Sequence, residues 1–428
     1  MNTSKAEPMS PTEVRLQDGH HQLRDGDLGV RIAAVGDLML GAGVGEAIKG
    51  IGPTHPLRAV RPLLAEADIR FANLEWPLTN TERRHPVIRH RARRAPREAI
   101  DSIEHAGFTV VSVANNHIFD CLDEGLADSL ALLHEKGIGW VGGGANLSSA
   151  RTPAIQTANG IRVGFLAYTF PLHQIATDMI PGCAPNDPGM MLDDVRRLKS
   201  VVDHVILSMH TGPDAGNEFC FYPSVSRQGL CRRLIDAGAT AILCHHCHVP
   251  QGIEVYSGGL IAHGLGSFIT DIHDWFFQSA KPPYSDFIDK AMIVQLELDR
   301  SRLLSFKVHP TMTGADLAVR PLSGKERAAY LEWLQDVSSV LYQTTALESR
   351  LPARHLGAKL ARLKDKALRN GALSLARELA ADALGAFDAR ILEPRRLGAL
   401  ERDLRASSCQ FVKTGIPVEV AGKLTGDR

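Results

Sequence analysis

The chain has 428 residues, too many for one modest hydrophobic core, so we expect one large domain with an appendage or two domains. Lysine plus arginine and aspartate plus glutamate number 48 each, which excludes a strong overall field that would attract nucleic acid or a membrane. No apolar run approaches the roughly 20 residues of a membrane span. Seven scattered cysteines and no hydrophobic leader predict reduced thiols and a cytoplasmic protein.

The first 245 residues predict a tail followed by an α/β domain. Residues 1–28 are polar and lack periodicity, which is typical of a flexible tail. From residue 29 onward, short apolar runs alternate with amphipathic stretches, as in a sheet whose strands are buried on both faces. We expect strands over 30–36, 68–73, 108–115, 162–168, 204–210 and 240–245. We expect helices over 55–67, 95–107, 124–137 and 224–238.

Beyond residue 253 the pattern changes first to hairpins and then to helix. One hairpin is expected to turn on Gly258-Gly259 and a second near residues 299–301. From residue 323 the sequence is helical to about 407. The predicted organisation is therefore a tail over 1–28, a domain over 29–322 and a helical C-terminal region over 323–428. This C-terminal region is suited to docking a protein partner.

Residue types that bind metals follow five of the expected strands. In chain order they are Asp37, Asn73 with Glu75, Asn115-Asn116-His117, His210, and the run CHHCH that holds His245, His246 and His248. Ligands gather at the carboxyl ends of strands in α/β sheets, so we expect these side chains to meet. Carboxylates can bridge two divalent ions, while imidazoles and an amide oxygen complete the coordination. Two ions about 3.5–4 Å apart can activate water and clamp a phosphoryl or acyl oxygen.

Each of these residues also has an ordinary interpretation. Asp37 could cap the following turn, and Glu75 could be a solvated loop charge. Asn115 and Asn116 could be turn residues, and His210 could be structural. The number of such segments and their positions at strand ends favour a metal site.

The chain resembles the CapA/PgsA family in five segments, which follow the family's order and spacing over about residues 31–272: AVGDLMLG, ANLEWPLT, SVANNHIFDCLDEGL, ILSMHTG and CHHCHVPQGIEVYSGGLIAHGLGSFITD. These are capsule and poly-γ-glutamate synthesis proteins within the calcineurin-like metallophosphoesterase superfamily. The resemblance implies a metallophosphoesterase-like four-layer α/β/β/α sandwich, here with a helical C-terminal region, and a site for two metal ions at the sheet edge.

The resemblance also implies individual roles. Asp37 and His248 would hold the first metal, and Asn116, His210 and His246 the second. Glu75 stands where the superfamily has a bridging aspartate, and His117 would face the substrate as the catalytic acid. Asn73, Asn115 and His245 would orient the ligands.

The sequence departs from the family pattern at several positions. Met39 stands where the superfamily signature has a histidine, which predicts fewer ligands for one metal. Ser267 stands where the family has an asparagine, and Thr211-Gly212 stands where the family has an aromatic residue followed by glycine. Contacts with the substrate, including those of Ser267, are therefore expected to differ. Cys244 and Cys247 are interpreted as packing residues, with a thiolate ligand at Cys247 as the alternative. A zinc knuckle is disfavoured because no second CxxC occurs.

One stretch, residues 83–96, is strongly basic. It is either a solvated loop or a lid that carries Arg89, Arg91, Arg93 and Arg94 to an anionic substrate, because guanidinium groups bind carboxylates and phosphates in a bidentate manner. Nucleic-acid binding is disfavoured, since no broader basic face or aromatic interleaving accompanies the stretch.

The leading functional prediction is a metal-dependent hydrolase with two divalent ions, Mn, Fe or Zn, that acts on a small anionic substrate, by default a phosphoester. A second hypothesis is a hydrolase or ligase for an amide bond of poly-γ-glutamate or a glutamate-rich peptide. A third is a non-catalytic metal-binding scaffold in a biosynthetic assembly. No nucleic-acid partner and no membrane span are expected.

Overall fold

Two β-sheets form the centre of the fold in the computed structural model, which describes residues 29–85, 92–170, 175–211 and 219–343. The first sheet has the strand order β15 (Val319–Pro321), β14 (Leu303–Thr313), β13 (Lys290–Leu298), β1 (Val30–Leu38), β2 (Ile69–Leu74), β3 (Val110–Ser112) and β4 (Gly139–Val141). The second has the order β11 (Ile253–Tyr256), β12 (Gly259–Ala262), β10 (Ala241–His245), β9 (His204–His210), β7 (Ile161–Thr169) and β6 (Ala154–Ala158). A short pair, β5 (Gly143–Gly144) and β8 (Gly182–Cys183), lies beside them.

The two sheets pack face to face. Alternate residues of a strand point to opposite sides of its sheet, so one set of apolar side chains meets the other sheet and the other set meets the helices. Ile32 of β1 belongs to the apolar cluster between the sheets, whereas its neighbour Ala33 belongs to the cluster beneath the first helical layer. Between the sheets, the rings of Phe71 and Phe165 stack with centroids 5.5 Å apart. These clusters explain the unbroken apolar runs of the central strands, which are buried on both faces.

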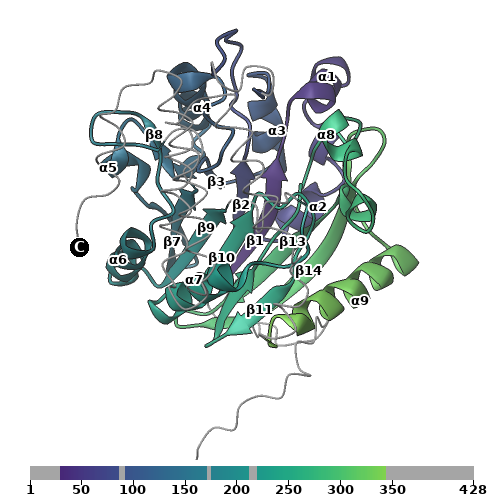
Figure 1. Ribbon diagram of the computed structural model, residues 1–428. Coiled ribbons are helices and arrows are strands. Elements are labelled where there is room, and N and C mark those ends of the chain that lie inside the picture. Colours follow the sequence, from purple (N-terminus) through teal and green to yellow (C-terminus); the bar gives the residue numbers. More distant parts are fainter. Residues whose placement is uncertain (1–28, 86–91, 171–174, 212–218, 344–428) are drawn as a thin grey trace, which may run out of the picture. The chain divides into compact units, whose positions relative to one another are not determined.

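Helices cover the outer face of each sheet (Figure 1). The first sheet is covered by α1 (Ala42–Gly50), α2 (Arg61–Ala65), α3 (Ala99–Ala106) and α4 (Leu122–Glu135). The second is covered by α6 (Pro188–Lys199) and α7 (Val225–Asp236), and the short helices α5 (Leu147–Ala150) and α8 (Trp275–Gln278) lie in connections. The predicted four-layer α/β/β/α sandwich is confirmed.

The helix α9 (Gly324–Val340) runs beside β14 and β11 (Figure 1). Its residues Tyr330 and Leu334 join the cluster between the sheets, and the Ser338 hydroxyl accepts the N–H of Ile253 at 2.9 Å. The first helix of the predicted C-terminal region therefore packs directly on the sheets. The remaining predictions for 344–428, and the tail predicted over 1–28, lie outside the described residues.

Two local predictions need correction. The helix expected over 55–67 is divided into a 3₁₀ turn, His55–Leu57, and α2, because Pro56 and Pro62 cannot donate backbone hydrogen bonds within a continuous helix. The first hairpin turns at Ser257-Gly258, one residue earlier than expected, with φ of 48° and 79° at these residues. The second hairpin joins β13 and β14 at the expected place.

The carboxyl ends of the parallel strands meet at one edge of the sandwich. In the first sheet β1, β2 and β3 are parallel, and in the second β7, β9, β10 and β12 are parallel. At this edge the Asp37 N–H donates to the Gly266 carbonyl oxygen at 3.1 Å. A Cβ atom on Gly36 would lie 1.9 Å from that same oxygen, so only glycine permits this approach.

Candidate metal centre

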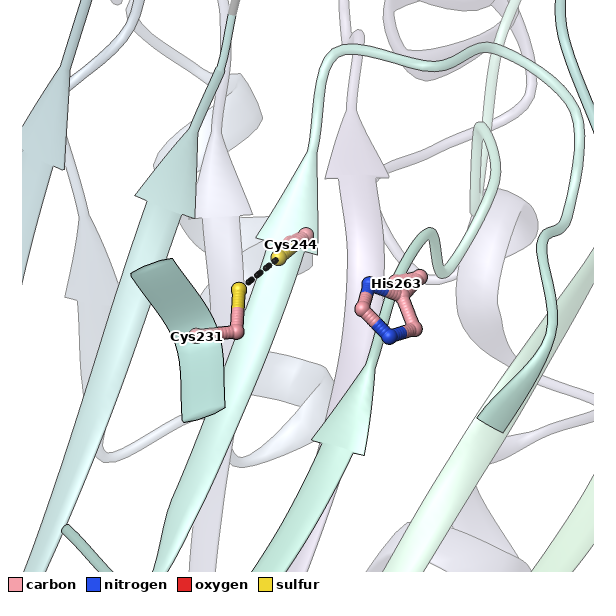
Figure 2. Close-up of side chains that lie close together, drawn as sticks. All are labelled: Cys231, Cys244 and His263. Atoms are coloured by element: carbon pink, nitrogen blue, oxygen red, sulfur yellow. Dashed lines mark hydrogen bonds between the residues drawn. The ribbon is translucent and has the colours of Figure 1, made fainter. Parts of the chain in front are cut away.

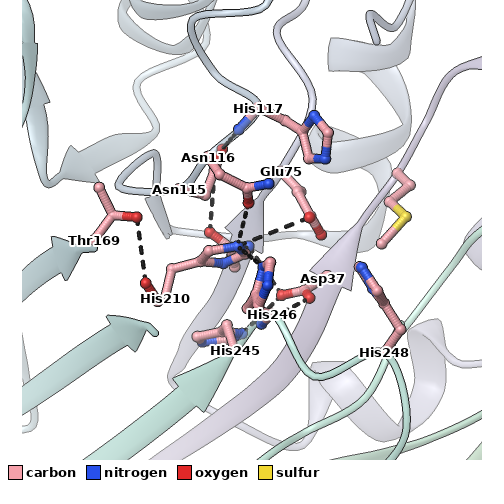
Figure 3. A network of polar contacts seen from close by, with 12 residues as sticks. Asp37, Glu75, Asn115, Asn116, His117, Thr169, His210, His245, His246 and His248 are labelled. Atoms are coloured by element: carbon pink, nitrogen blue, oxygen red, sulfur yellow. Dashed lines mark hydrogen bonds and ion pairs between the residues drawn. The ribbon is translucent and has the colours of Figure 1, made fainter. Parts of the chain in front are cut away.

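All six predicted metal ligands meet at this edge (Figure 3). Asp37 lies near the end of β1, and Glu75 directly follows β2. Asn116 lies in the loop after β3, His210 ends β9, and His246 and His248 follow β10. Both sheets therefore contribute side chains, and residues more than two hundred positions apart in the sequence become neighbours.

The potential ligands form two overlapping groups. Atoms of Glu75, His210 and His246 lie within 4.8 Å of one another, and so do atoms of Asp37, Glu75 and His248. All of these residues are buried. Glu75 belongs to both groups, which is the arrangement of a carboxylate between two adjacent cations.

The group of Glu75, His210 and His246 converges, together with Asn116, on one atom of His210. Its Nε2 lies 2.7 Å from Asn116 Oδ1, 3.1 Å from His246 Nδ1 and 3.8 Å from Glu75 Oε1. An oxygen from an amide, an oxygen from a carboxylate and two imidazole nitrogens thus surround a small volume. This donor set suits divalent ions such as manganese, iron and zinc.

Asp37 is held in place by three hydrogen bonds. Its Oδ1 lies 2.9 Å from Asn73 Nδ2 and 3.0 Å from His245 Nδ1, and its Oδ2 accepts the His246 N–H at 3.3 Å. Burial alone would raise the pKa of Asp37, but the hydrogen bond with His245 and the electrostatic attraction of that ring outweigh burial and lower the pKa below its ordinary value. The carboxylate is therefore ionised near neutral pH.

Asn115 connects the second strand to the loop that carries His117. Its Nδ2 donates to the Leu74 carbonyl at 2.8 Å and to Asn73 Oδ1 at 3.2 Å. Its Oδ1 accepts the N–H groups of His117 at 3.1 Å and Ile118 at 2.8 Å. The three residues predicted to orient the ligands, Asn73, Asn115 and His245, all make such supporting contacts.

His246 has an unusual backbone conformation. Its φ is 83°, in the left-handed region that residues other than glycine rarely adopt. This conformation directs its N–H toward Asp37 while its ring reaches His210. Strain of this kind persists where the surrounding contacts impose it, and it is concentrated at functional sites.

The protonation state of the histidines also fits divalent metal ions. Burial lowers the pKa of His210 and of His246 well below the ordinary value, and lowers the pKa of His248 to about 4. All three imidazoles are therefore neutral at pH 7 and do not need to lose a proton before they bind a metal.

His117, the predicted catalytic residue, is partly exposed beside the metal ligands. Its Nδ1 lies 2.8 Å from Oδ2 of Asp120, a fully buried carboxylate that also accepts the Arg93 N–H at 2.6 Å. A carboxylate on one ring nitrogen fixes the tautomer and leaves the other nitrogen for a substrate. Asp120 was not among the predicted site residues, although its position three residues after His117 in NNHIFD was a usable signal.

The predicted substrate-binding residues are placed differently from one another. The guanidinium of Arg93 lies close to the site but pairs with Asp274 at 2.7 Å, and that of Arg94 pairs with Glu82 at 2.6 Å. Arg89 and Arg91 lie outside the described residues. Ser267 is buried, and its hydroxyl lies 3.1 Å from His248 Nδ1, a position suited to orienting that ring.

Cys247 makes packing contacts beside the site. Its thiol donates to the Cys220 carbonyl at 2.9 Å, and Cys247 is in neither of the two overlapping ligand groups. Cys244 points into the apolar cluster beneath α7.

The fold and the site together define an α/β/β/α protein with a candidate centre for two adjacent cations. The model of the family described as bacterial capsule synthesis protein PGA_cap matches residues 31–272. This is more than half of the chain, which therefore belongs to that family.

Named relatives agree with this assignment. The capsule biosynthesis protein CapA of Bacillus anthracis is 31% identical over 245 residues, which cover 55% of this chain and 59% of the relative. The PGA biosynthesis protein CapA of Bacillus subtilis is 30% identical over 240 residues, 55% of this chain and 62% of the relative. A probable polyglutamine synthesis accessory protein of Mycobacterium tuberculosis is 35% identical over 175 residues, 38% of this chain and 45% of the relative. The chain thus spans about three-fifths or less of these relatives.

Solved structures resemble the chain only distantly. A hypothetical protein from Thermus thermophilus is 15% identical with a TM-score of 0.40 and covers 65% of this chain and 98% of its own. A putative 5'-nucleotidase from Staphylococcus aureus is 12% identical with a TM-score of 0.40 and covers 72% of this chain and 58% of its own. Within the described part of the chain, no helix combines the length and apolarity needed to cross a membrane.

Proposed function

We propose that the chain is a metal-dependent hydrolase that acts on an anionic substrate at a site for two divalent ions. The observation that carries this proposal is the position of Glu75, which belongs to both groups of potential ligands. Asp37 and His248 would hold one ion, and Asn116, His210 and His246 the other. When bound, the ions would polarise the substrate and generate a nucleophile from water near neutral pH.

The charge of the site favours an anionic substrate. Asp37 and Glu75 are the carboxylates among its proposed ligands, and burial keeps three of its imidazoles neutral. Two divalent ions held against two carboxylates leave a net charge of about +2 at the buried edge of the sheets. A phosphate or carboxylate would be attracted there, whereas the residues alone would repel it.

His117 is proposed to exchange a proton with the leaving group. Asp120 engages Nδ1, so Nε2 is the nitrogen that remains for the substrate. The same hydrogen bond stabilises the imidazolium that carries this proton. Because His117 is partly exposed while the metal ligands are buried, it marks the open side of the site.

Two bonds are candidates for hydrolysis. A phosphoester is the leading proposal, because two-ion sites built from these residue types stabilise both the attacking and the leaving oxygen. An amide bond of a glutamate-rich peptide is the second candidate, favoured by the names of the relatives, which concern capsule, PGA and polyglutamine synthesis. Both substrates are anionic, so both agree with the charge of the site.

The test measures turnover of p-nitrophenyl phosphates and of γ-glutamyl peptides side by side, with full-length protein before and after chelation. Chelation should abolish turnover, and Mn²⁺ should restore it. His210→Ala should remove activity, whereas His204→Ala, at the opposite end of the same strand β9, should retain it. Turnover unchanged by chelation would contradict the proposal. No turnover of either substrate, with or without added Mn²⁺, would favour the non-catalytic scaffold.

A further inference from the structure

A second cluster of metal-binding side chains lies away from the candidate centre, between the second sheet and its helices (Figure 2). It consists of Cys231 of α7, Cys244 of β10 and His263, which directly follows β12. Strands β10 and β12 run parallel with Leu243 opposite Ala262, so Cys244 and His263 are the next residues along adjacent strands. The helix α7 covers them, and all three side chains are fully buried.

The distances within this cluster suit one ion. The two sulfurs lie 4.0 Å apart, and the ligand atoms of all three residues lie within 4.8 Å of one another. Two thiolate sulfurs at about 2.3 Å from one tetrahedral zinc ion are about 3.8 Å apart. Binding would therefore require only small movements, whereas a disulfide would require the sulfurs to approach to about 2.05 Å.

The histidine is already oriented for such an ion. His263 Nε2 lies 3.1 Å from Oε2 of the buried Glu254, so Nδ1 is the nitrogen that would face the sulfurs. Glu254 in turn accepts hydrogen bonds from Gln228 at 3.0 Å and from Arg232 at 2.6 Å. A carboxylate behind a histidine is the usual support of a metal-binding imidazole, because it fixes the tautomer and raises ligand basicity.

The charge balance selects the ion. Two thiolates and one Zn²⁺ are neutral together, and the neighbouring Glu254 and Arg232 neutralise each other. A monovalent ion on the same two thiolates would leave a net negative charge in a fully buried place, which is costly. Thiolate ligands also disfavour manganese and magnesium, which prefer oxygen. The cluster thus differs chemically from the candidate metal centre, whose proposed ligands contain no sulfur.

We propose that Cys231, Cys244 and His263 form a zinc site that fixes α7 to the end of β10. Three protein ligands of this kind leave a fourth position for a small ligand, as in other Cys₂His zinc sites. Cys244 immediately precedes His245 and His246, so the zinc ion would hold the strand end that delivers these residues to the candidate metal centre. This inference stands independently of the proposed hydrolytic activity.

The test titrates reduced full-length protein with Co²⁺ and records near-ultraviolet absorption. Thiolate-to-cobalt charge transfer should appear and saturate within three equivalents, because the candidate metal centre would also bind Co²⁺, and three equivalents of Zn²⁺ should abolish it. Cys231→Ser and Cys244→Ser should each lose the band. Cys183→Ser and Cys247→Ser should keep it, because Cys183 is a buried thiol outside the cluster and Cys247 lies beside the other site.

The outcomes separate zinc binding from simple packing. No charge-transfer band in the wild-type protein would overturn the proposal, and so would a band that is lost in Cys247→Ser but kept in Cys231→Ser. Far-UV circular dichroism checks that the variants fold. If the cluster variants do not fold, X-ray absorption of wild-type protein with three equivalents of zinc, enough for the cluster and for the candidate metal centre, decides: a sulfur contribution at about 2.3 Å supports the site, and nitrogen or oxygen alone overturns it.

Discussion

Replacing Gly36 by alanine should couple a loss of stability to a loss of metal binding. The added Cβ would lie 1.9 Å from the Gly266 carbonyl oxygen, the acceptor of the Asp37 N–H hydrogen bond, so the two segments must separate by more than about 1 Å to reach ordinary contact distances. Overpacking of this kind costs about 1–3 kcal/mol. Loss of the hydrogen bond adds about 1 kcal/mol. We expect the free energy of unfolding to fall by about 2–4 kcal/mol in total.

Urea unfolding and Mn²⁺ titration test this expectation on the same protein. Gly50→Ala is the matched control, because Gly50 is exposed at the end of α1 with no atom within 4 Å of the new Cβ. That change should be neutral or should stabilise by about 0.4–1 kcal/mol. The reasoning is refuted if Gly36→Ala unfolds at the wild-type urea concentration and binds Mn²⁺ with wild-type affinity, since the close approach would then not position Asp37.

Three further changes are expected to have separable effects. Asp120→Asn should lower turnover by roughly 10²–10⁴-fold while the metal content stays constant, because His117 loses the carboxylate that fixes its tautomer; equal metal loss would contradict this. Burial raises the pKa of Asp194, but hydrogen bonds from Arg151, Tyr168 and Arg197 lower it by more, so the pKa lies below its ordinary value. The Asp194 carboxylate therefore stabilises the protein fully above the unfolded pKa of about 3.9, and this stabilisation is lost as pH falls through the lower folded pKa. The difference in unfolding free energy between the wild-type protein and Asp194→Asn should accordingly vanish when unfolding is measured in acid. Ser338→Ala should cost about 1–3 kcal/mol in thermal unfolding, because the buried N–H of Ile253 loses its acceptor; an unchanged Tm would contradict this.

The sequence predicted the central strands because their signal is local, whereas the four layers were implied only by the resemblance to the CapA/PgsA family. Alternation of apolar runs and amphipathic stretches reports burial directly, and the strand predicted over 204–210 is observed as β9. The helix over 55–67 was wrong because proline divides it. The α6 helix was missed, although Asp187 immediately precedes it and accepts the Met190 N–H with its side chain, so the N-terminal signal of the helix was present.

The site could be anticipated because its residues follow strand ends, whose positions the topology fixes. Spacing alone could not give contacts between distant segments. The pairing of Arg93 with Asp274 joins residues 181 positions apart, and it changes how that guanidinium would meet a substrate. The juxtaposition of Cys231 with His263 likewise depends on how α7 packs on the second sheet, which the sequence does not encode as a motif.

The claim that Glu75 lies between two cations is tested most directly by electron paramagnetic resonance of the Mn²⁺-loaded protein. The account predicts the spectrum of a magnetically coupled manganese pair in the wild-type protein. Glu75→Gln should abolish the coupling, whereas Glu297→Gln, a buried glutamate that pairs with Arg31 away from the site, should preserve it. Isolated Mn²⁺ signals in fully loaded wild-type protein would contradict the account.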